Sequence, residues 1–306
     1  MNHRTADRVV QAKTWEEHPG EAFAAWLGQA RAAHDRPLRA SSQTIYRGMF
    51  EALLTYLAGQ GVGLAELTPE HIEAFLTARE VDLHRRHRYL LLFSRMTGHL
   101  QGLGLVGARN PARELLLQDP RPEDSPAQAL TPEETKRLLH VLGSVGRGAW
   151  RQARLRAVVH TLLFAGLRSS ELTQLTLGQV SPTTLEIPAV KPRPSRSIPI
   201  DLALQGVLQE WLAERTTRLV ATDRVFPSNP QGDPIAASTL FRQVRGSLQA
   251  AGVCSSIEGP TLLRNTCAAR WLATQPIAKV CNWMGYEKVQ SALRFSEAAK
   301  AWEARA

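Results

Sequence analysis

Residues 165–172 read Ala-Gly-Leu-Arg-Ser-Ser-Glu-Leu, which places an arginine just after a glycine turn and an acid three residues later. The guanidinium of Arg168 offers a planar set of donors that matches a carboxylate or a phosphate. The spacing therefore allows two interpretations: Arg168 pairs with Glu171, or it presents its charge to an anion. The stretch by itself does not choose between them, so the motifs on either side are needed.

A basic loop follows on the C-terminal side, between two short β-prone runs. Residues 185–187 (Leu-Glu-Ile) and 198–200 (Ile-Pro-Ile) flank the sequence Lys-Pro-Arg-Pro-Ser-Arg at 191–196. Because β-prone runs separated by turn residues indicate a hairpin, this segment predicts a hairpin with a basic, proline-stiffened tip. Lys191 is either a solvated tip residue or a second group directed at the same anion as Arg168.

Two further motifs complete the set. Residues 261–266 read Thr-Leu-Leu-Arg-Asn-Thr, which puts Arg264 near the start of a predicted helix. Residues 283–286 read Trp-Met-Gly-Tyr, and Phe295 follows Tyr286 by nine positions. Each motif alone has a simpler explanation, and Arg264 could be one surface arginine among many, whereas the order of the motifs along the chain is more specific.

The hydrophobic pattern predicts two domains, mainly α with a small β-hairpin (an α+β second domain). Residues 1–19 are expected to be a loose N-terminal segment and 20–117 a helical domain, with helices near 21–33, 42–59, 69–76 and 83–102. Residues 118–129 have a proline-rich, polar linker composition. Residues 130–306 form the second domain, with helices after the hairpin expected near 202–219, 236–251, 261–273 and 277–284, and from 289 to the end.

The charge is concentrated in the second domain. The chain of 306 residues has a formal net charge of +9, yet residues 1–129 hold 15 basic and 15 acidic residues, while 130–306 hold 22 and 13. Only six of the 37 basic residues are lysines, and arginine suits phosphate contacts. These values favour nucleic acid as a partner over a neutral ligand.

Several classes of protein are disfavoured. No apolar stretch approaches the length of about 20 residues that a membrane span needs, and the first residues lack the apolar core of a signal peptide. The three cysteines are widely spaced and match neither a disulfide framework nor a zinc site. We therefore expect no metal, no cofactor, no membrane contact and a cytoplasmic, nucleoid-associated protein.

Taken together, the motifs resemble the tyrosine recombinases of the phage integrase family, with a Xer-like layout, over roughly residues 20–306. The resemblance implies that residues 20–117 are a core-binding, DNA-contacting domain and 130–306 a catalytic-type domain. It further implies that Arg168 and Arg264 clamp a scissile phosphate and that Lys191 protonates the leaving oxygen. The family's nucleophile is a tyrosine that forms a phosphotyrosyl link to DNA without metal or ATP.

Three positions depart from the family pattern. Thr261 and Tyr286 stand where the family has histidine or, at the second position, tryptophan. Phe295 stands where the nucleophilic tyrosine is expected. Because phenylalanine has no hydroxyl, residue 295 cannot form a phosphoester. The pattern thus predicts a degenerate site, a pseudoenzyme that retains its phosphate clamp.

Other basic side chains are candidates for DNA contacts. A predicted helix of the first domain carries Arg85, Arg88 and Arg95. The second domain adds a helical stripe of Arg147, Arg151 and Arg154, the hairpin residue Arg196, and the pair Arg242 and Arg245. Each cluster also fits a solvated helix face. The tail from Ser296 to Ala306 is expected either to dock on a neighbouring copy or to pack on its own domain through Trp302.

Three functions remain open. The leading hypothesis is a double-stranded-DNA-binding protein that does not cleave DNA itself and serves beside an active recombinase, as an accessory, architectural or regulatory protein of a mobile genetic element in DNA integration or recombination. The second is an active recombinase that uses Tyr286 or another nucleophile. The third is a protein that binds only a partner recombinase and has lost DNA binding.

Overall fold

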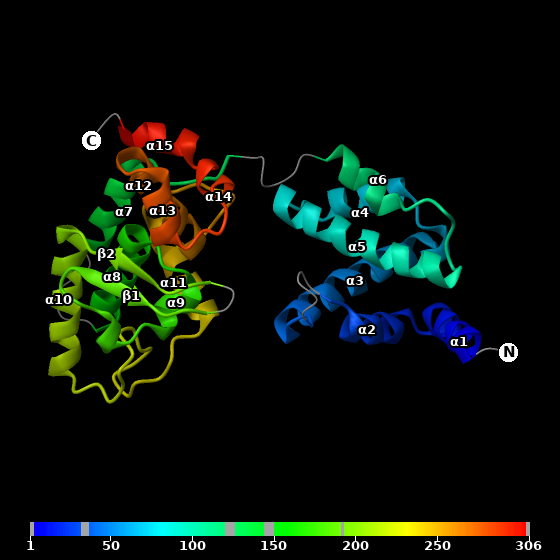
Figure 1. Ribbon diagram of the computed structural model, residues 1–306, viewed down its shortest axis with the longest axis horizontal. Helices are drawn as coiled ribbons and strands as arrows, with labels where there is room; N and C mark the ends of the chain where they lie inside the picture. Colours follow the sequence, from blue (N-terminus) through cyan, green and yellow to red (C-terminus); the bar gives the residue numbers. More distant parts are fainter. Residues whose placement is uncertain (1–2, 32–36, 120–125, 144–149, 191–192, 304–306) are drawn as a thin grey trace. The chain divides into compact units, whose positions relative to one another are not determined.

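The structure is a computed structural model that describes residues 3–31, 37–119, 126–143, 150–190 and 193–303. The chain separates into two compact units, Met1–Pro122 and Glu123–Ala306 (Figure 1). The division falls inside the segment 118–129, which has the composition of a linker. Each unit has its own hydrophobic core and is described by itself.

The first unit is helical throughout its described ranges. Its helices are α1 (His3–Glu17), α2 (Pro19–Gln29), α3 (Ala40–Gln60), α4 (Pro69–Ala78), α5 (Leu83–Leu103) and α6 (Pro111–Gln118). The prediction of a loose segment over 1–19 is wrong, because residues 3–17 form α1. The reason is Trp15, which is only 5% exposed and meets the rings of Phe23 and Phe50 edge-on. One aromatic anchor therefore ties an otherwise polar helix to the core.

Local signals in the sequence fix most helix ends of this unit. Thr68 caps α4 with Pro69 in the first turn, and Asp82 caps α5 by accepting from the backbone N–H of Arg85 at 2.8 Å. Gly61 and Gly104 end α3 and α5 in the left-handed conformation that favours glycine. Asn110 caps α6, and Pro111 is its first residue.

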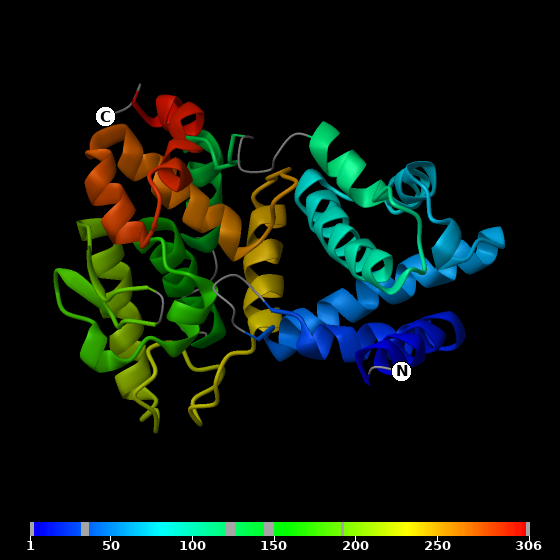
Figure 2. The ribbon, with the colours of Figure 1, turned by 45° about the vertical axis from the view of Figure 1, so that its right-hand side comes forward.

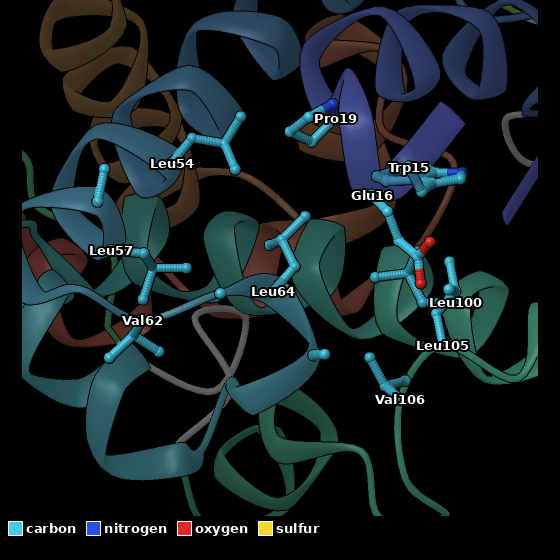
Figure 3. Close-up of a pocket in the computed structure, with 13 residues that line it drawn as sticks. Trp15, Glu16, Pro19, Leu54, Leu57, Val62, Leu64, Leu100, Leu105 and Val106 are labelled. Carbon is cyan, nitrogen blue, oxygen red and sulfur yellow. The ribbon is translucent and has the colours of Figure 1, made fainter. Parts of the chain in front are cut away.

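An apolar pocket of about 430 Å³ lies in the first unit where α3 and α5 end (Figure 3). Leu57 and Leu100 are buried at 1% and 2% exposure, and Val62 and Leu105, which follow the two terminal glycines, also line it. Glu16 is the only charged side chain of its lining. A carboxylate among apolar groups repels phosphate, so this pocket does not suit a DNA backbone.

The second unit is mainly helical with a two-stranded sheet, which confirms the predicted fold class. Its helices are α7 (Pro132–Gly143), α8 (Trp150–Ala165), α9 (Ser169–Gln174), α10 (Leu202–Thr217), α11 (Ala237–Ala250), α12 (Pro260–Thr274), α13 (Ile277–Met284), α14 (Gln290–Leu293) and α15 (Ser296–Glu303). Strands β1 (Thr184–Ile187) and β2 (Arg196–Pro199) pair antiparallel, with Leu185 opposite Ile198 and Ile187 opposite Arg196. The predicted hairpin is therefore present.

Helix α8 is the central element of this unit. It packs against α10 and α12, and eleven of its sixteen residues are buried. In Figure 2, α12 and α15 lie against one another on the C-terminal side of the unit. Because α8 is enclosed on several sides, it shows little amphipathic pattern, and its C-terminal end delivers the chain into the turn at Gly166. This turn sets the position of Arg168.

The end of the chain differs from the prediction of one helix from 289 onward. The helix is broken into α14 and α15, and Phe295 lies between them. In α15, Trp302 donates its indole N–H to the carbonyl of Leu130 at 3.2 Å and lies 5.5 Å from the Arg270 guanidinium. Residues 296–303 of the tail thus pack on their own domain, and docking of the tail on a neighbouring copy stays a prediction. No helix in the described parts of the chain is both long and apolar enough to cross a membrane.

Candidate functional site

A pocket of about 750 Å³ in the second unit brings together most of the predicted site. Arg168, Thr261, Arg264, Tyr286 and Phe295 all line it, although they come from four separate stretches of the chain. Lys191 and its neighbour Pro192 lie outside the described residues. The pocket therefore unites five of the six positions at which the sequence suggested phosphate chemistry.

The turn after α8 is built around Gly166. Its φ of +60° is in the left-handed region, and a Cβ there would lie 2.8 Å from the Met284 sulfur and 3.0 Å from that of Cys267. Its carbonyl accepts a hydrogen bond from Nη1 of Arg264. Only glycine satisfies this backbone angle and this packing together. The Gly-Leu-Arg order thus has a geometric cause: the glycine allows the close approach and supplies an acceptor to the second arginine.

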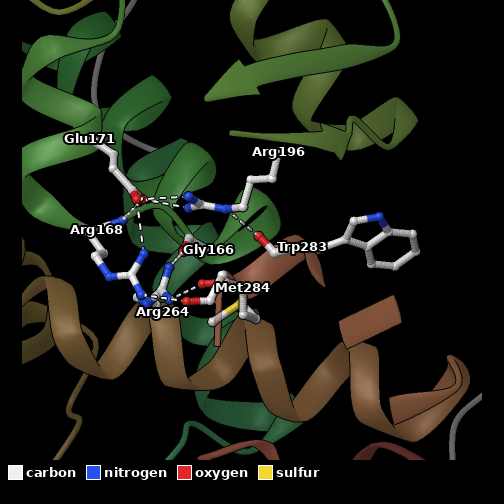
Figure 4. A network of polar contacts seen from close by, with 8 residues as sticks. Gly166, Arg168, Glu171, Arg196, Arg264, Trp283 and Met284 are labelled. Atoms are coloured by element: carbon white, nitrogen blue, oxygen red, sulfur yellow. Dashed lines mark hydrogen bonds and ion pairs between the residues drawn. The ribbon is translucent and has the colours of Figure 1, made fainter. Parts of the chain in front are cut away.

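Glu171 binds two arginines at once (Figure 4). Its carboxylate accepts two hydrogen bonds from Arg196, at 2.9 and 2.7 Å, and one from Nη1 of Arg168 at 3.0 Å. Burial raises the pKa of Glu171, but the hydrogen bonds and charges of Arg196 and Arg168 outweigh that effect and hold the pKa at about 2. The carboxylate is therefore ionised at any physiological pH.

Arg168 is placed to face both this carboxylate and the pocket. Its Nη2 donates to the carbonyl of Gly285 at 2.9 Å, and its side chain is 22% exposed. The contacts to Glu171 and Gly285 engage both terminal nitrogens, each of which carries a second N–H. The pairing of Arg168 with Glu171 is therefore confirmed. Arg168 also lines the pocket, and its contact with an anion there stays a prediction.

Arg264 is more enclosed than Arg168. It is 9% exposed and donates to the carbonyls of Gly166 and Met284. Burial lowers its pKa to about 10, so the guanidinium stays charged at neutral pH. With Arg168 and Arg196, it makes three guanidinium groups around the single carboxylate of Glu171. This excess of positive charge favours an anion in the pocket.

Two aromatic rings form another wall of the pocket. The rings of Tyr286 and Phe295 are stacked, with centroids 6.3 Å apart and planes 12° apart, and the Arg264 guanidinium lies 5.5 Å from the Tyr286 ring. Phe295 is 4% exposed. Burial raises the pKa of the Tyr286 hydroxyl, which disfavours its ionised form. The wall thus holds one neutral phenol and one ring with no polar atom.

The remaining predicted DNA contacts fall into two groups. Six of the arginines lie on the surface; these are Arg85, Arg88, Arg95, Arg151, Arg242 and Arg245. Among these, Arg95 donates to the carbonyl of Arg31 at 2.8 Å, and Arg245 pairs with Glu258 at 2.8 Å. Arg147 lies outside the described residues.

Arg196 and Arg154 are buried, contrary to their prediction as DNA contacts. The side chain of Arg196 is 2% exposed and bonds Glu171 and, at 2.8 Å, the carbonyl of Trp283. Arg154 is 2% exposed and donates to the carbonyls of Pro227 and Ser228. A guanidinium enclosed by protein acceptors is not presented to DNA. Arg196 instead ties β2 to α9 and α13, and Arg154 holds the loop at 227–228. Alternation along β2 could have signalled this for Arg196, whose side chain shares a face with buried Ile198.

Sequence reasoning missed several residues of the pocket. Asn265, Ser291 and Arg294 also line it. The carbonyls of Met284 and Gly285, which fix the two arginines, were missed as well. Asn265 and Arg294 are direct neighbours of predicted residues, which is the only signal for them in the sequence. Within the described ranges, no group of three or more His, Cys, Asp or Glu side chains could hold a metal ion.

Comparison with known proteins identifies the family. Residues 128–301 match the phage integrase family. The chain belongs to this family, the tyrosine recombinases. Curated relatives include the tyrosine recombinase XerD of Brucella suis biovar 1, which is 26% identical over 237 residues covering 74% of this chain and 76% of XerD. Tyrosine recombinase XerH of Helicobacter pylori is 25% identical over 190 residues, covering 57% of this chain and 51% of XerH.

Solved structures share the recombinase fold over nearly the whole chain. A XerH recombinase bound to a palindromic difH substrate in a post-cleavage complex aligns with a TM-score of 0.65 and 16% identity, over 96% of this chain and 86% of that one. A lambda integrase dimer bound to a core site aligns with a TM-score of 0.66 and 14% identity, over 96% and 81%. At these identities the similarity establishes the fold.

Proposed function

We propose that this recombinase-family protein binds double-stranded DNA at the pocket of Arg168 and Arg264 but does not cleave it through residue 295. The observation that carries the proposal is Phe295: it lies in the same pocket as both arginines, and it has no hydroxyl. Two guanidiniums facing a pocket with excess positive charge suit a phosphate. A ring without a nucleophilic atom leaves the phosphodiester intact.

The proposal assigns the protein an accessory, architectural or regulatory role beside an active recombinase. Support comes from the XerH and lambda integrase structures, which are complexes with DNA, the latter a dimer. Residues 20–117 are proposed as the core-binding domain, with Arg85 and Arg88 exposed on α5. The exposed arginines of both units would extend the footprint along the phosphates.

A covalent-adduct assay tests the absence of cleavage. Duplexes selected by the wild-type protein from a random-sequence pool are nicked near the selected site, which traps any protein–DNA ester. We expect no adduct with wild type and an adduct with Phe295→Tyr, because the arginines remain in place. The control Phe295→Tyr combined with Arg168→Ala should lose that adduct. A covalent adduct formed by the wild-type protein would refute the proposal.

A second candidate function is cleavage through Tyr286. It is favoured by one observation, the position of the Tyr286 ring in the pocket, 5.5 Å from the Arg264 guanidinium. The raised pKa of this phenol works against it, because attack needs the deprotonated oxygen. If wild type forms an adduct that Tyr286→Phe abolishes, this candidate replaces the first.

A third alternative, binding to a partner recombinase alone, is tested by the salt dependence of DNA binding. A protein that neutralises phosphates loses affinity steeply as salt rises. A mobility-shift titration that detects no DNA complex even at low salt would favour this alternative.

A further inference from the structure

The segment Pro126–Leu130, here called the strap, covers the last residues of the linker (118–129) and binds residues that line the pocket. Its backbone N–H at Ala127 donates to the carbonyl of Arg294 at 2.9 Å. Its carbonyl at Gln128 accepts from the Asn265 side chain at 2.9 Å. Its backbone N–H at Leu130 donates to the Thr266 hydroxyl at 2.9 Å. Three backbone positions of the strap are thus each bonded to other segments of the second unit.

The side chain of Gln128 adds a further anchor. Its Oε1 accepts from the Ser255 hydroxyl at 2.7 Å, the Ser256 hydroxyl at 3.0 Å and the backbone N–H of Ile257 at 3.3 Å. These residues form the loop that leads into α12, the helix that carries Thr261 and Arg264. One amide oxygen therefore accepts three hydrogen bonds from the loop that precedes α12.

The strap binds two residues of the pocket wall. Asn265 and Arg294, the partners of Gln128 and Ala127, both line the pocket. Ala127 is 7% exposed and belongs to the same buried apolar cluster as Phe295 and Met284. Contacts of the strap therefore reach α12, on which Arg264 lies, and the junction of α14 and α15, on which Phe295 lies.

We propose that Gln128 is a positioning residue for the phosphate pocket, and that the strap links the end of the interdomain linker to the geometry of Arg264 and Phe295. Gln128 acts through Asn265 and the loop at 255–257 and makes no contact with DNA itself. The inference rests on the proposed DNA binding for its functional consequence. Its structural part, the restraint of these segments by Gln128, holds with or without DNA.

Amide hydrogen exchange on the full-length, DNA-free protein tests the structural part. The amide of Ile257 donates both to Gln128 Oε1, at 3.3 Å, and to Ser255 Oγ, at 3.1 Å, and Ser255 is itself bonded to Gln128. In Gln128→Ala it loses the first acceptor and the restraint on the second, so it should exchange about 2- to 10-fold faster. Amides at Ala127 and Arg294 should follow in the same direction. Gln128→Glu keeps an acceptor oxygen and should retain protection. Gln209→Ala, at an exposed position of α10, is the matched control and should leave these amides unchanged.

A salt titration of DNA binding tests the functional part. Gln128→Ala should weaken affinity about 3- to 10-fold. Glutamine is uncharged, so the slope of log K against log salt changes only if a charged contact, such as that of Arg264, is lost. DNA affinity equal to that of wild type in Gln128→Ala would overturn the functional part. Unchanged exchange at Ile257 in Gln128→Ala would overturn the restraint by the strap. If the exchange changes as expected while wild type binds no DNA, the restraint stands and the DNA-binding proposal fails.

Discussion

The wall of the pocket lined by Arg168 and Arg264 and the layer directly behind it use the same residue type with different partners. Arg168 and Arg264 line the pocket, whereas Arg196 sits behind them with its side chain 2% exposed and bonded to Glu171. Both layers use the arginine guanidinium, and what differs is its burial and its partners. The comparison teaches that an arginine count indicates a DNA-binding protein but does not say which arginines bind.

The largest expected effect comes from removing the layer behind the pocket. Arg196→Ala leaves the buried carboxylate of Glu171 with only Arg168, and breaking a buried ion pair costs about 3–5 kcal/mol. Chemical denaturation should show this loss in the free energy of unfolding. Arg242→Ala, at an exposed position, should change it by no more than about 0.5 kcal/mol. Equal losses for the two variants would erase the distinction between the layers.

Low pH should reduce the stability that the Glu171 ion pairs contribute behind the pocket. The pKa of Glu171 falls from 4.5 to about 2 on folding, so its contribution is complete above pH 4.5 and is lost as the pH falls toward 2. The full contribution is on the order of 3 kcal/mol. Unfolding free energies measured between pH 6 and pH 2 should fall more steeply for wild type than for Glu171→Gln. Parallel curves would remove Glu171 as the source of acid sensitivity.

Substitutions in the pocket wall should change DNA affinity more than they change the stability of the fold. Arg168→Gln removes a charged donor proposed to contact phosphate, which is worth about 1.5–3 kcal/mol, or roughly 10- to 150-fold in DNA affinity. Glu171 keeps both of its bonds from Arg196, so the protein should stay folded. Mobility shifts at fixed salt, with thermal melts alongside, measure the two quantities. A large drop in melting temperature with unchanged affinity would assign Arg168 to the inner layer.

The smallest effect is expected at the exposed arginines of α11. Arg242→Ala should reduce the slope of log K against log salt by about 0.9, as the loss of one phosphate contact predicts. Arg154→Ala should leave the slope unchanged and lower stability, because Arg154 is buried against Pro227 and Ser228. Salt titrations of both variants on one duplex compare them directly. A slope change in Arg154→Ala alone would reverse the assignment.

Much of the fold followed from local signals. Thr68-Pro69, Gly285 after α13 and the runs around the hairpin each set a boundary through capping or turn chemistry that neighbouring residues determine. Helix α1 did not follow, because its order depends on Trp15 reaching Phe23 and Phe50, the latter 35 positions later. The break between α14 and α15 was not predicted either, because the residues on both sides of it favour helix.

The sequence predicts which residues share the candidate site but not which acceptors bind its arginines. The order of the motifs placed Arg168, Thr261, Arg264, Tyr286 and Phe295 in one site, and all five line one pocket. Which acceptors hold each guanidinium depends on backbone carbonyls, and every residue has one, so no side-chain pattern signals Met284 or Gly285 as a partner. The burial of Arg154 was not predicted either, because its carbonyl acceptors lie on a loop more than seventy residues away.

Gly166 bears on how related sequences should be compared. It has no side chain and performs no chemistry, yet its turn, its carbonyl and the closeness of Met284 and Cys267 determine where Arg264 rests. Any substitution there strains the backbone and collides with two sulfur atoms at once. A screen for surviving variants should therefore find position 166 as intolerant as an arginine of the clamp. Invariance of that glycine would report geometry and not catalysis, so it could persist in descendants that have stopped cutting DNA.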